Sequence, residues 1–248
     1  MSRRAIASAA VFGLALAGCS RSGGNEAAQS NGAAPLPQIA APNHGDWTES
    51  VSLTERGGYL MGNPNAPVKL IEYGSITCPV CARFSVDAYE ALTSRYVRSG
   101  QVSWEYRPFL IHATDPGVFL LLRCAGPAPY FRLAEQLYAT QREWAGRAES
   151  LPPDQAQQIQ SLEPHAQASA MVRVMGVDQF FRQRGISEAR INACLADDAA
   201  LQQLGEIARR ASTEDNVTGT PTFIVNGDKL DTTDWANLET RLRAAVGG

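Results

Sequence analysis

The chain has five cysteines in 248 residues, and their spacing restricts its fold and chemistry more than any other feature. They are Cys19, Cys78, Cys81, Cys124 and Cys194. Cys78 and Cys81 form a close pair. They lie where a short apolar run at 68–73 is followed by a helical pattern that begins at Pro79. Three-residue spacing in the first turn of a helix brings two sulfurs onto one side, within bonding distance. We therefore predict a reactive cysteine pair where a buried strand meets a helix.

The position of Cys78 at the start of this helix predicts which sulfur reacts first. Proline at a first helical position loses no hydrogen bond, so Pro79 fits this helix start. The unpaired N–H groups and the positive end of the helix dipole stabilise a thiolate there, and the thiolate is the form that attacks disulfides. We predict that Cys78 attacks and that Cys81 resolves the mixed disulfide.

A close cysteine pair can also be half of a zinc site, which needs two further ligands. No second pair with this spacing exists. The three histidines, His44, His112 and His165, are isolated from one another in the sequence. We expect no metal and no cofactor, and no catalytic role for the histidines.

The order of predicted elements is βαβ, a long helical insertion, then ββα. Residues 68–73 are apolar and lead into a helix that should end at Gly100, and 102–107 alternate as a second, parallel strand. From about 113 to 212 the pattern is helical and is interrupted by proline and glycine. An Asn-Gly turn follows the strand at 222–225, and a last helix begins at Asp234. This order predicts a single α/β domain over 46–248, in which aromatic residues such as Phe131 and Trp144 belong to the core rather than to a client groove.

The N-terminus has the pattern of a secretory signal. Two arginines precede an apolar run that is too short to cross a bilayer and that ends in Leu16-Ala17-Gly18-Cys19. These four residues resemble the bacterial lipobox, which implies cleavage after residue 18 and a lipid on Cys19. The alternative is an ordinary signal peptide with Cys19 incidental. Residues 19–45 are rich in small and polar types, as expected of a flexible tether.

Charge argues against nucleic acid as a partner. The chain has 22 basic and 25 acidic residues, and the predicted signal removes two arginines and no acid, so the remainder carries a net charge of −5. By resemblance to bacterial sorting signals, Ser20 favours delivery to the outer membrane. We expect a monomer on the periplasmic side of a bacterial membrane.

The chain resembles the DsbA-like branch of the thioredoxin superfamily. The resemblance rests on Cys78-Pro79-Val80-Cys81, on Glu72 six residues upstream, on the helical insertion, and on Gly219-Thr220-Pro221-Thr222. It implies a thioredoxin-like fold and a cis peptide bond before Pro221, beside the sulfurs. It also implies that the backbone of Thr220 pairs with an extended substrate and that Glu72 exchanges protons with Cys81. Glu72 shares a strand face with buried residues, which predicts partial burial, although strand ends are often wet.

The two remaining cysteines, Cys124 and Cys194, both lie in the predicted insertion. The expected compartment permits disulfides, and we predict that these two form a structural one. Some DsbA-like proteins carry such a second bridge. Two buried free thiols are the alternative.

The resemblance also implies partners. They are thiol- or disulfide-containing envelope proteins, and either a quinone-linked membrane oxidase or a reducing conduit. We predict a disulfide donor that is milder than the strongest members, because those have histidine where this chain has Val80. Thr220 also differs from the valine of the best-studied oxidases. A reductase or isomerase is the alternative, and a non-catalytic chaperone or binding protein is an alternative of a different class.

Overall fold

The computed structural model describes residues 34–42 and 45–247. The predicted signal peptide, the lipidation site Cys19 and His44 lie outside the described residues. None of the helices in the described part of the chain is long and apolar enough to cross a bilayer.

The described residues contain a six-stranded sheet with the order β1-β2-β4-β3-β5-β6. Its strands are β1 (Val51–Leu53), β2 (Tyr59–Met61), β3 (Val68–Gly74), β4 (Val102–Pro108), β5 (Thr222–Val225) and β6 (Asp228–Lys229). The two central strands, β3 and β4, run parallel, with Val68 opposite Val102 and Gly74 opposite Pro108. All other neighbours are antiparallel. The loops that follow β3 and β4 therefore leave the sheet at the same edge.

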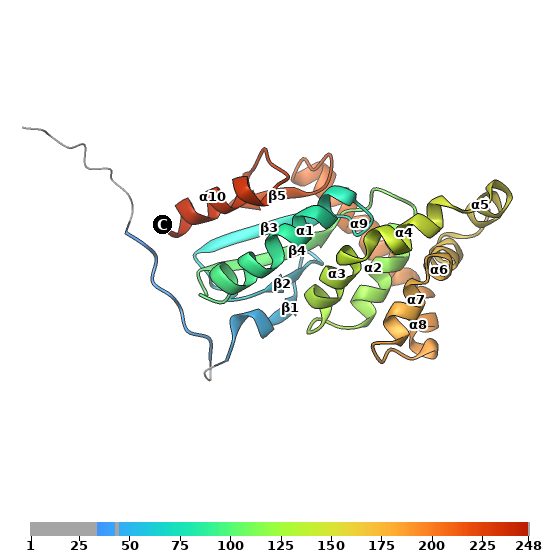
Figure 1. Ribbon diagram of the computed structural model, residues 1–248, viewed down its shortest axis with the longest axis horizontal. Helices are drawn as coiled ribbons and strands as arrows, with labels where there is room; N and C mark the ends of the chain where they lie inside the picture. The colour runs from blue at the N-terminus through green and yellow to red at the C-terminus, as the bar shows by residue number, and fades with distance from the viewer. Residues whose placement is uncertain (1–33, 43–44, 248) are drawn as a thin grey trace, which may run out of the picture. The chain divides into compact units, whose positions relative to one another are not determined.

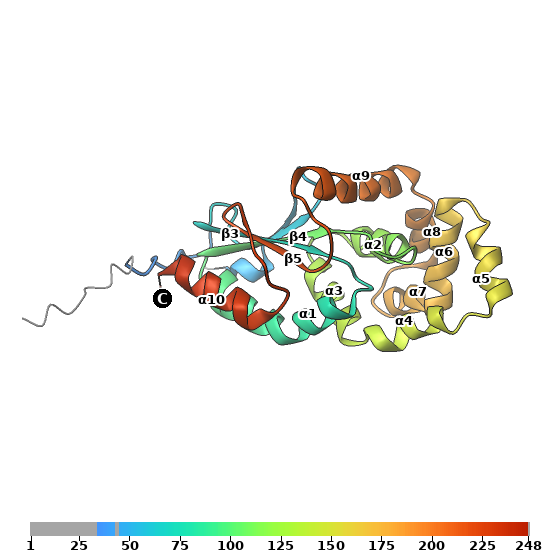
Figure 2. The ribbon, with the colours of Figure 1, turned by 90° about the horizontal axis from the view of Figure 1, so that it is seen from above.

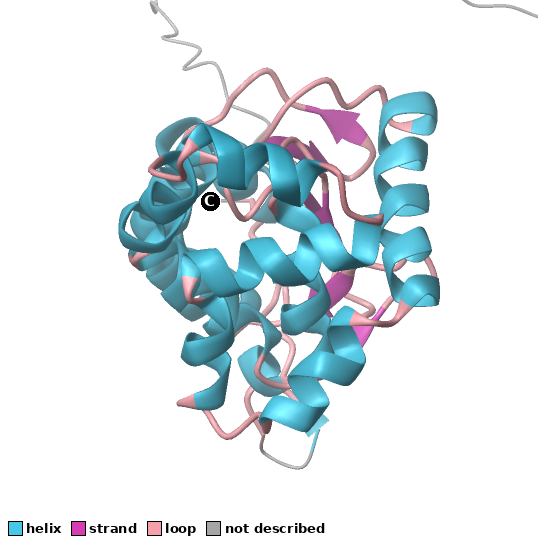
Figure 3. Cartoon of the chain, turned by 90° about the vertical axis from the view of Figure 1, so that its right-hand side faces the viewer, coloured by secondary structure: helices cyan, strands magenta, loops and turns pink. Residues whose placement is uncertain are grey.

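Helices cover both faces of this sheet, and the insertion extends beyond its end. The helices are α1 (Pro79–Ala91), α2 (Asp115–Cys124), α3 (Tyr130–Ala139), α4 (Gln141–Glu149), α5 (Pro153–Gln160), α6 (Pro164–Met175), α7 (Val177–Arg182), α8 (Glu188–Leu195), α9 (Asp198–Glu214) and α10 (Trp235–Val246). Figure 2 shows α1 and α10 on one side of the strands and α9 on the other. The insertion, α2 to α9, places α4 to α8 past one end of the sheet (Figure 1), and these helices lie in front of the strands when that end faces the viewer (Figure 3). The predicted α/β class and element order are confirmed.

The first two strands were not predicted from the sequence. β1 and β2 have three residues each, too few to display a clear alternation of apolar and polar residues. They are held by long-range pairing, since β2 lies beside β4 with Tyr59 opposite Tyr106. Together, β1 and β2 extend the sheet beyond β4.

The helix after the cysteines does not continue regularly to Gly100 as predicted. After α1 the chain adopts a wider π-type turn, η3 (Leu92–Val97). The hydroxyl of Thr93 donates to the carbonyl oxygens of Tyr89 and Glu90, at 2.7 and 3.3 Å. Such side-chain bonds compete with the backbone ladder of a helix and favour a local change of pitch.

The core lies between the sheet and the helices and includes the aromatic residues that the sequence assigned to it. Phe131 and Trp144 have only 3% and 6% of their surface exposed. Phe131 packs against Trp104 of β4, with ring centroids 4.7 Å apart. This packing ties the insertion to the centre of the sheet.

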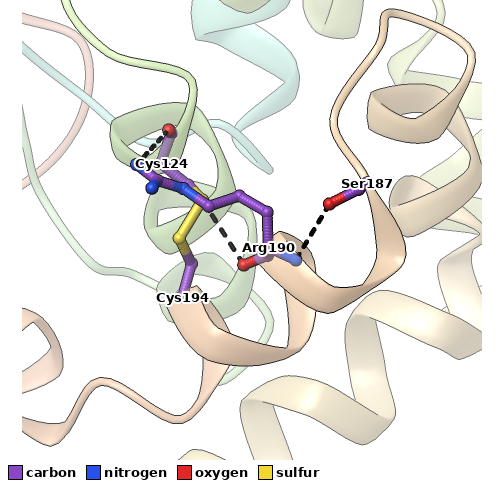
Figure 4. Close-up of a disulfide and its surroundings, with 4 residues drawn as sticks. All are labelled: Cys124, Ser187, Arg190 and Cys194. Carbon is purple, nitrogen blue, oxygen red and sulfur yellow. Dashed lines mark hydrogen bonds between the residues drawn. A yellow bond between two sulfur atoms is a disulfide. The ribbon is translucent and has the colours of Figure 1, made fainter.

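Cys124 and Cys194 form the predicted disulfide. It joins the last residue of α2 to α8, across 70 residues of sequence (Figure 4). Ser187 caps α8 by accepting the N–H of Arg190 at 3.3 Å. The guanidinium of Arg190 in turn donates to the carbonyl oxygen of Cys124 at 3.5 Å. The bond and this contact fasten two helices of the insertion to each other.

The described end of the predicted tether lies against the domain. The N–H of Leu36 donates to the carbonyl of Val246 at 2.8 Å, and the N–H of Ile39 donates to that of Ser99, also at 2.8 Å. The indole N–H of Trp47 donates to the carbonyl of Ile39 at 2.7 Å. Contacts with the domain therefore begin before residue 46, the boundary that the composition predicted. Composition could not reveal these contacts, because backbone hydrogen bonds do not depend on side-chain type.

Candidate active site

Cys78 lies at the N-cap of α1, four residues past the end of β3. Its backbone is extended, with φ −74° and ψ 121°, and its sulfur accepts the N–H of Cys81 at 3.5 Å. Among the described residues, Cys78 and Cys81 are free thiols. Cys78 is 5% exposed and Cys81 is fully buried, so a reactant reaches Cys78 first.

The pKa values of the two thiols move in opposite directions. A hydrogen bond from the Cys81 thiol, helped by other donors that include the N–H groups of Cys81 and Val80, lowers the pKa of Cys78 to about 5. Burial raises the pKa of Cys81 well above its usual value. The pair therefore has one accessible thiolate and one buried thiol that keeps its proton.

Glu72 is more deeply buried than the sequence suggested, with 2% of its surface exposed. It lies in β3 between Tyr106 of β4 and Phe223 of β5, and the indole N–H of Trp104 donates to it at 3.1 Å. Burial raises the pKa of Glu72 to about 8. When ionised, Glu72 adds to the rise in the pKa of Cys81 that burial causes. A carboxyl group that stays protonated at neutral pH thus lies near the buried sulfur.

Glu72→Gln is expected to stabilise the fold in a pH-dependent way. Glutamate in an unfolded chain ionises near pH 4.5, whereas the folded chain keeps this proton up to about pH 8. Folded wild-type protein therefore loses stability as pH rises through this window, and the neutral variant does not. At 1.36 kcal/mol per pH unit, the variant should gain about 3 kcal/mol over wild type by pH 7.

Urea unfolding of both proteins between pH 4 and pH 8 measures this difference. Glutamine retains an oxygen that can accept the Trp104 N–H, so little packing changes. Glu90→Gln removes the same charge from the exposed surface of α1 and supplies the baseline. A gain that does not change with pH would contradict the burial argument.

The loop before β5 completes the surroundings of the sulfurs. The peptide bond between Thr220 and Pro221 is cis, as predicted. The Cys78 thiol donates to the carbonyl oxygen of Thr220 at 3.4 Å. The hydroxyl of Thr220 is buried and makes no hydrogen bond of ordinary geometry within the described residues. It is still close enough to both sulfurs to act as a weak donor, which lowers the pKa of each thiol. The structure thus brings together Glu72, Cys78, Cys81, Thr220 and Pro221.

Three polar residues that hold the loop before Cys78 were not predicted. Gln141 donates from its amide to the carbonyl oxygens of Ile76 and Cys78, at 2.9 Å each. The hydroxyl of Tyr138 donates to the carbonyl of Ser75 at 3.0 Å. The buried carboxylate of Asp115 accepts hydrogen bonds from the same loop. All three come from the insertion, which therefore supports the cysteine pair directly.

Other predicted site residues lie elsewhere. Cys124 and Cys194 belong to the structural disulfide, on a different part of the insertion. His165, for which the sequence predicted no catalytic role, lies on α6, 3.5 Å from Asp198. Within residues 34–42 and 45–247, no group of three or more His, Cys, Asp and Glu side chains is placed to hold a metal ion.

The family model described as Thioredoxin matches residues 54–244, from just before β2 to the last helix. The chain belongs to the thioredoxin family. The cysteine pair, Glu72 and the loop with Pro221 all fall within the matched region.

Solved structures give the branch of the thioredoxin family that this fold resembles. A protein-disulfide isomerase from Novosphingobium aromaticivorans is 28% identical, with 76% of this chain and 97% of that chain covered and a TM-score of 0.73. Wolbachia pipientis α-DsbA1 is 16% identical, with 79% of this chain and 94% of that chain covered and a TM-score of 0.63. The fold is DsbA-like, a thioredoxin fold with a helical insertion.

A curated relative from Rickettsia bellii, provisionally named a protein-disulfide oxidoreductase, is 23% identical over 169 residues. The match covers 68% of this chain and 56% of the relative. The chain thus spans little more than half the length of that curated relative.

Proposed function

We propose that this chain is a thiol-disulfide oxidoreductase that donates disulfides to secreted proteins through Cys78 and Cys81. The observation that carries the proposal is the opposite direction of the two pKa values, about 5 for Cys78 and well above the usual range for Cys81. A stabilised thiolate favours the reduced pair, and a stable reduced form makes the disulfide form an oxidant. The names of the Rickettsia and Novosphingobium relatives are consistent with chemistry of this class.

The reaction follows from the positions of the groups. A client thiolate attacks Cys78 of the oxidised pair, the bond to Cys81 breaks, and its electron pair goes to the Cys81 sulfur. Glu72, protonated below about pH 8, supplies the proton that this buried sulfur needs. A second client thiolate then attacks the client sulfur of the mixed disulfide. The client disulfide forms, and Cys78 leaves as a thiolate after the pair has gained two electrons.

The neighbourhood of Thr220 supports a docking mode for the client. The carbonyl oxygen of Thr220 lies 3.4 Å from the Cys78 sulfur, on the loop that leads into β5. An extended client segment that pairs with this backbone would present its own sulfur to Cys78. Such pairing recognises main chain rather than sequence, as an enzyme with many clients requires.

The redox equilibrium of the full chain against glutathione tests the direction of electron transfer. We expect a reduction potential between about −270 mV, the value of thioredoxin, and about −120 mV, the value of the strongest DsbA oxidant. Val80→His should lower the pKa of Cys78 and raise the potential, because an imidazole beside the thiolate supplies a donor and a charge. Val86→His places the same group on the exposed side of α1, two turns from the pair, and should change neither. A wild-type potential near that of thioredoxin would instead favour a reductase.

We further propose that the protein acts at the periplasmic side of a bacterial membrane, anchored by lipid on Cys19. Support comes from the basic start, the short apolar run and the position of Cys19 directly after Gly18. A quinone-linked membrane oxidase is the partner that would reoxidise the pair. Metabolic labelling with a fatty acid tests the anchor, since Cys19→Ser should abolish the label.

A further inference from the structure

A chain of hydrogen bonds runs from a buried carboxylate to an exposed imidazole through the residue that precedes Cys78. The loops after the parallel strands β3 and β4 meet at one edge of the sheet, and Asp115, which is fully buried, lies between them. Thr77, the residue before Cys78, donates its hydroxyl to Asp115 at 2.8 Å. The same hydroxyl oxygen lies 2.8 Å from Nδ1 of His112.

The donors around Asp115 fix the direction of these bonds. Its two oxygens receive the hydroxyl of Ser75, the N–H and hydroxyl of Thr77, and the N–H groups of Ile111 and His112. With its only proton committed to this carboxylate, the Thr77 oxygen must accept from His112. The network therefore assigns a proton to Nδ1 and leaves Nε2 of the neutral ring as a free acceptor.

The imidazole of His112 borders a cavity of about 390 Å³. Thr77 and His112 line it together with apolar residues of the insertion, among them Ala148, Leu151 and Met171. Glu149 is the other titratable side chain of its lining. The cavity reaches Thr77, which directly precedes Cys78, so a client side chain bound in it would lie beside an oriented imidazole.

We propose that His112 is the proton acceptor for the client thiol that attacks Cys78, and that Thr77 and Asp115 are positioning residues for its ring. The proposal rests on the thiol-disulfide oxidoreductase function. The client S–H proton moves to Nε2, the client sulfur attacks Cys78, and the bond between Cys78 and Cys81 breaks with its electron pair on Cys81. The imidazolium then returns its proton to water.

This role answers a need that the lowered pKa of Cys78 does not meet. An ordinary cysteine has a pKa of about 8.5, so a client thiol is largely protonated at neutral pH and attacks slowly. A base held beside the target sulfur removes this barrier for alkyl thiols. A thiol that is already ionised gains nothing from it.

Two probe thiols separate these cases in the full chain oxidised at Cys78 and Cys81. 2-Mercaptoethanol is protonated at pH 7, whereas the aromatic thiol 2-nitro-5-thiobenzoate is ionised. His112→Gln is expected to slow reaction with 2-mercaptoethanol by about a hundredfold, the lower end of general base effects, and to leave the aromatic thiol reaction unchanged. The reduction potential should not change, because a base accelerates both directions equally.

Matched variants locate the effect. His165→Gln makes the same replacement on α6, outside the cavity lining, and should leave both rates as in wild type. Thr77→Val keeps the side-chain shape but frees the ring, and should reproduce the selective loss to a smaller degree. Equal slowing of both thiols by His112→Gln, or no slowing of either, would overturn the proposal. Wild-type protein that reacts with neither thiol would instead overturn the oxidoreductase function on which it rests.

Discussion

Cys78→Ser is expected to reduce thiol exchange to the uncatalysed rate, whereas Cys81→Ser should accumulate mixed disulfides with client proteins. Cys78 is the more accessible member of the pair, and with a pKa of about 5 its thiol is almost wholly ionised at pH 7. An unperturbed cysteine is only a few per cent ionised at this pH. Removing Cys78 therefore removes the nucleophile, and no other sulfur at the site can replace it, because Cys81 is buried and keeps its proton.

The Cys81 variant retains the attack but lacks the sulfur that resolves the covalent intermediate. Non-reducing electrophoresis of envelope extracts should reveal adducts that disappear on reduction. The double variant Cys78→Ser/Cys81→Ser is the matched control and should form none. Adducts formed by Cys78→Ser instead would reverse the two roles.

Alkylation separates this enzyme from a thioredoxin-fold chaperone or binding protein. Blocking both thiols of the reduced protein should abolish its effect on the oxidative refolding of a reduced client. If the effect survives complete modification of Cys78 and Cys81, the protein acts on its clients by binding, and the redox pair is not needed.

The parts of the fold that the sequence predicted are those with a strong local signal. The strand at 68–73 has an apolar run bounded by Pro67 and Gly74, and the helix after it begins with a cysteine pair and a proline, which favour a helix start. The hairpin of β5 and β6 follows from an Asn-Gly turn. In each case the residues that determine the element lie within about ten positions of one another in the sequence.

The parts that were missed depend on contacts between distant segments. Strand β2 forms by pairing with β4, where Tyr59 lies opposite Tyr106, a residue 47 positions later in the sequence. Strand β1 in turn pairs with β2. Gln141 and Tyr138 donate to carbonyl groups of the loop before Cys78, and a polar residue on a helix carries no sequence mark of such a partner. His112 was set aside for the same reason, since its isolation from other histidines bears on zinc binding and not on a contact with Thr77.

The burial of Glu72 shows the limit of reasoning from one strand. Its place on the same face as Val68 and Leu70 predicted partial burial, and the alternation of exposure along β3 agrees with that face. Complete burial results from the neighbouring strands and from Trp104 and the insertion residues around it, which alternation within β3 cannot reveal. The functional consequence, a carboxyl group with a pKa of about 8, therefore required the structure.

Loss of the disulfide between Cys124 and Cys194 is expected to destabilise the chain by about 4 kcal/mol. The bond closes a loop of 70 residues, and cross-linking a loop of this length restricts the unfolded chain by about that free energy. For a domain of this size the loss corresponds to a fall in melting temperature of about 10 °C. The expected effect on the redox pair is small by comparison, because the bond joins α2 to α8 (Figure 4), whereas Cys78 is the N-cap of α1.

Thermal and urea unfolding of Cys124→Ser, Cys194→Ser and the double variant measure this contribution. Each single variant breaks the whole cross-link, so each should lose nearly the full amount and the double variant should lose little more. This non-additive pattern distinguishes a cross-link from two independent buried side chains, whose losses would sum. In a Cys78→Ser/Cys81→Ser background, which removes the stabilisation of the reduced redox pair, treatment with a reductant should lower the stability by about the same amount as the double variant loses. Equal stability of this background before and after reduction would contradict a structural role for the bond.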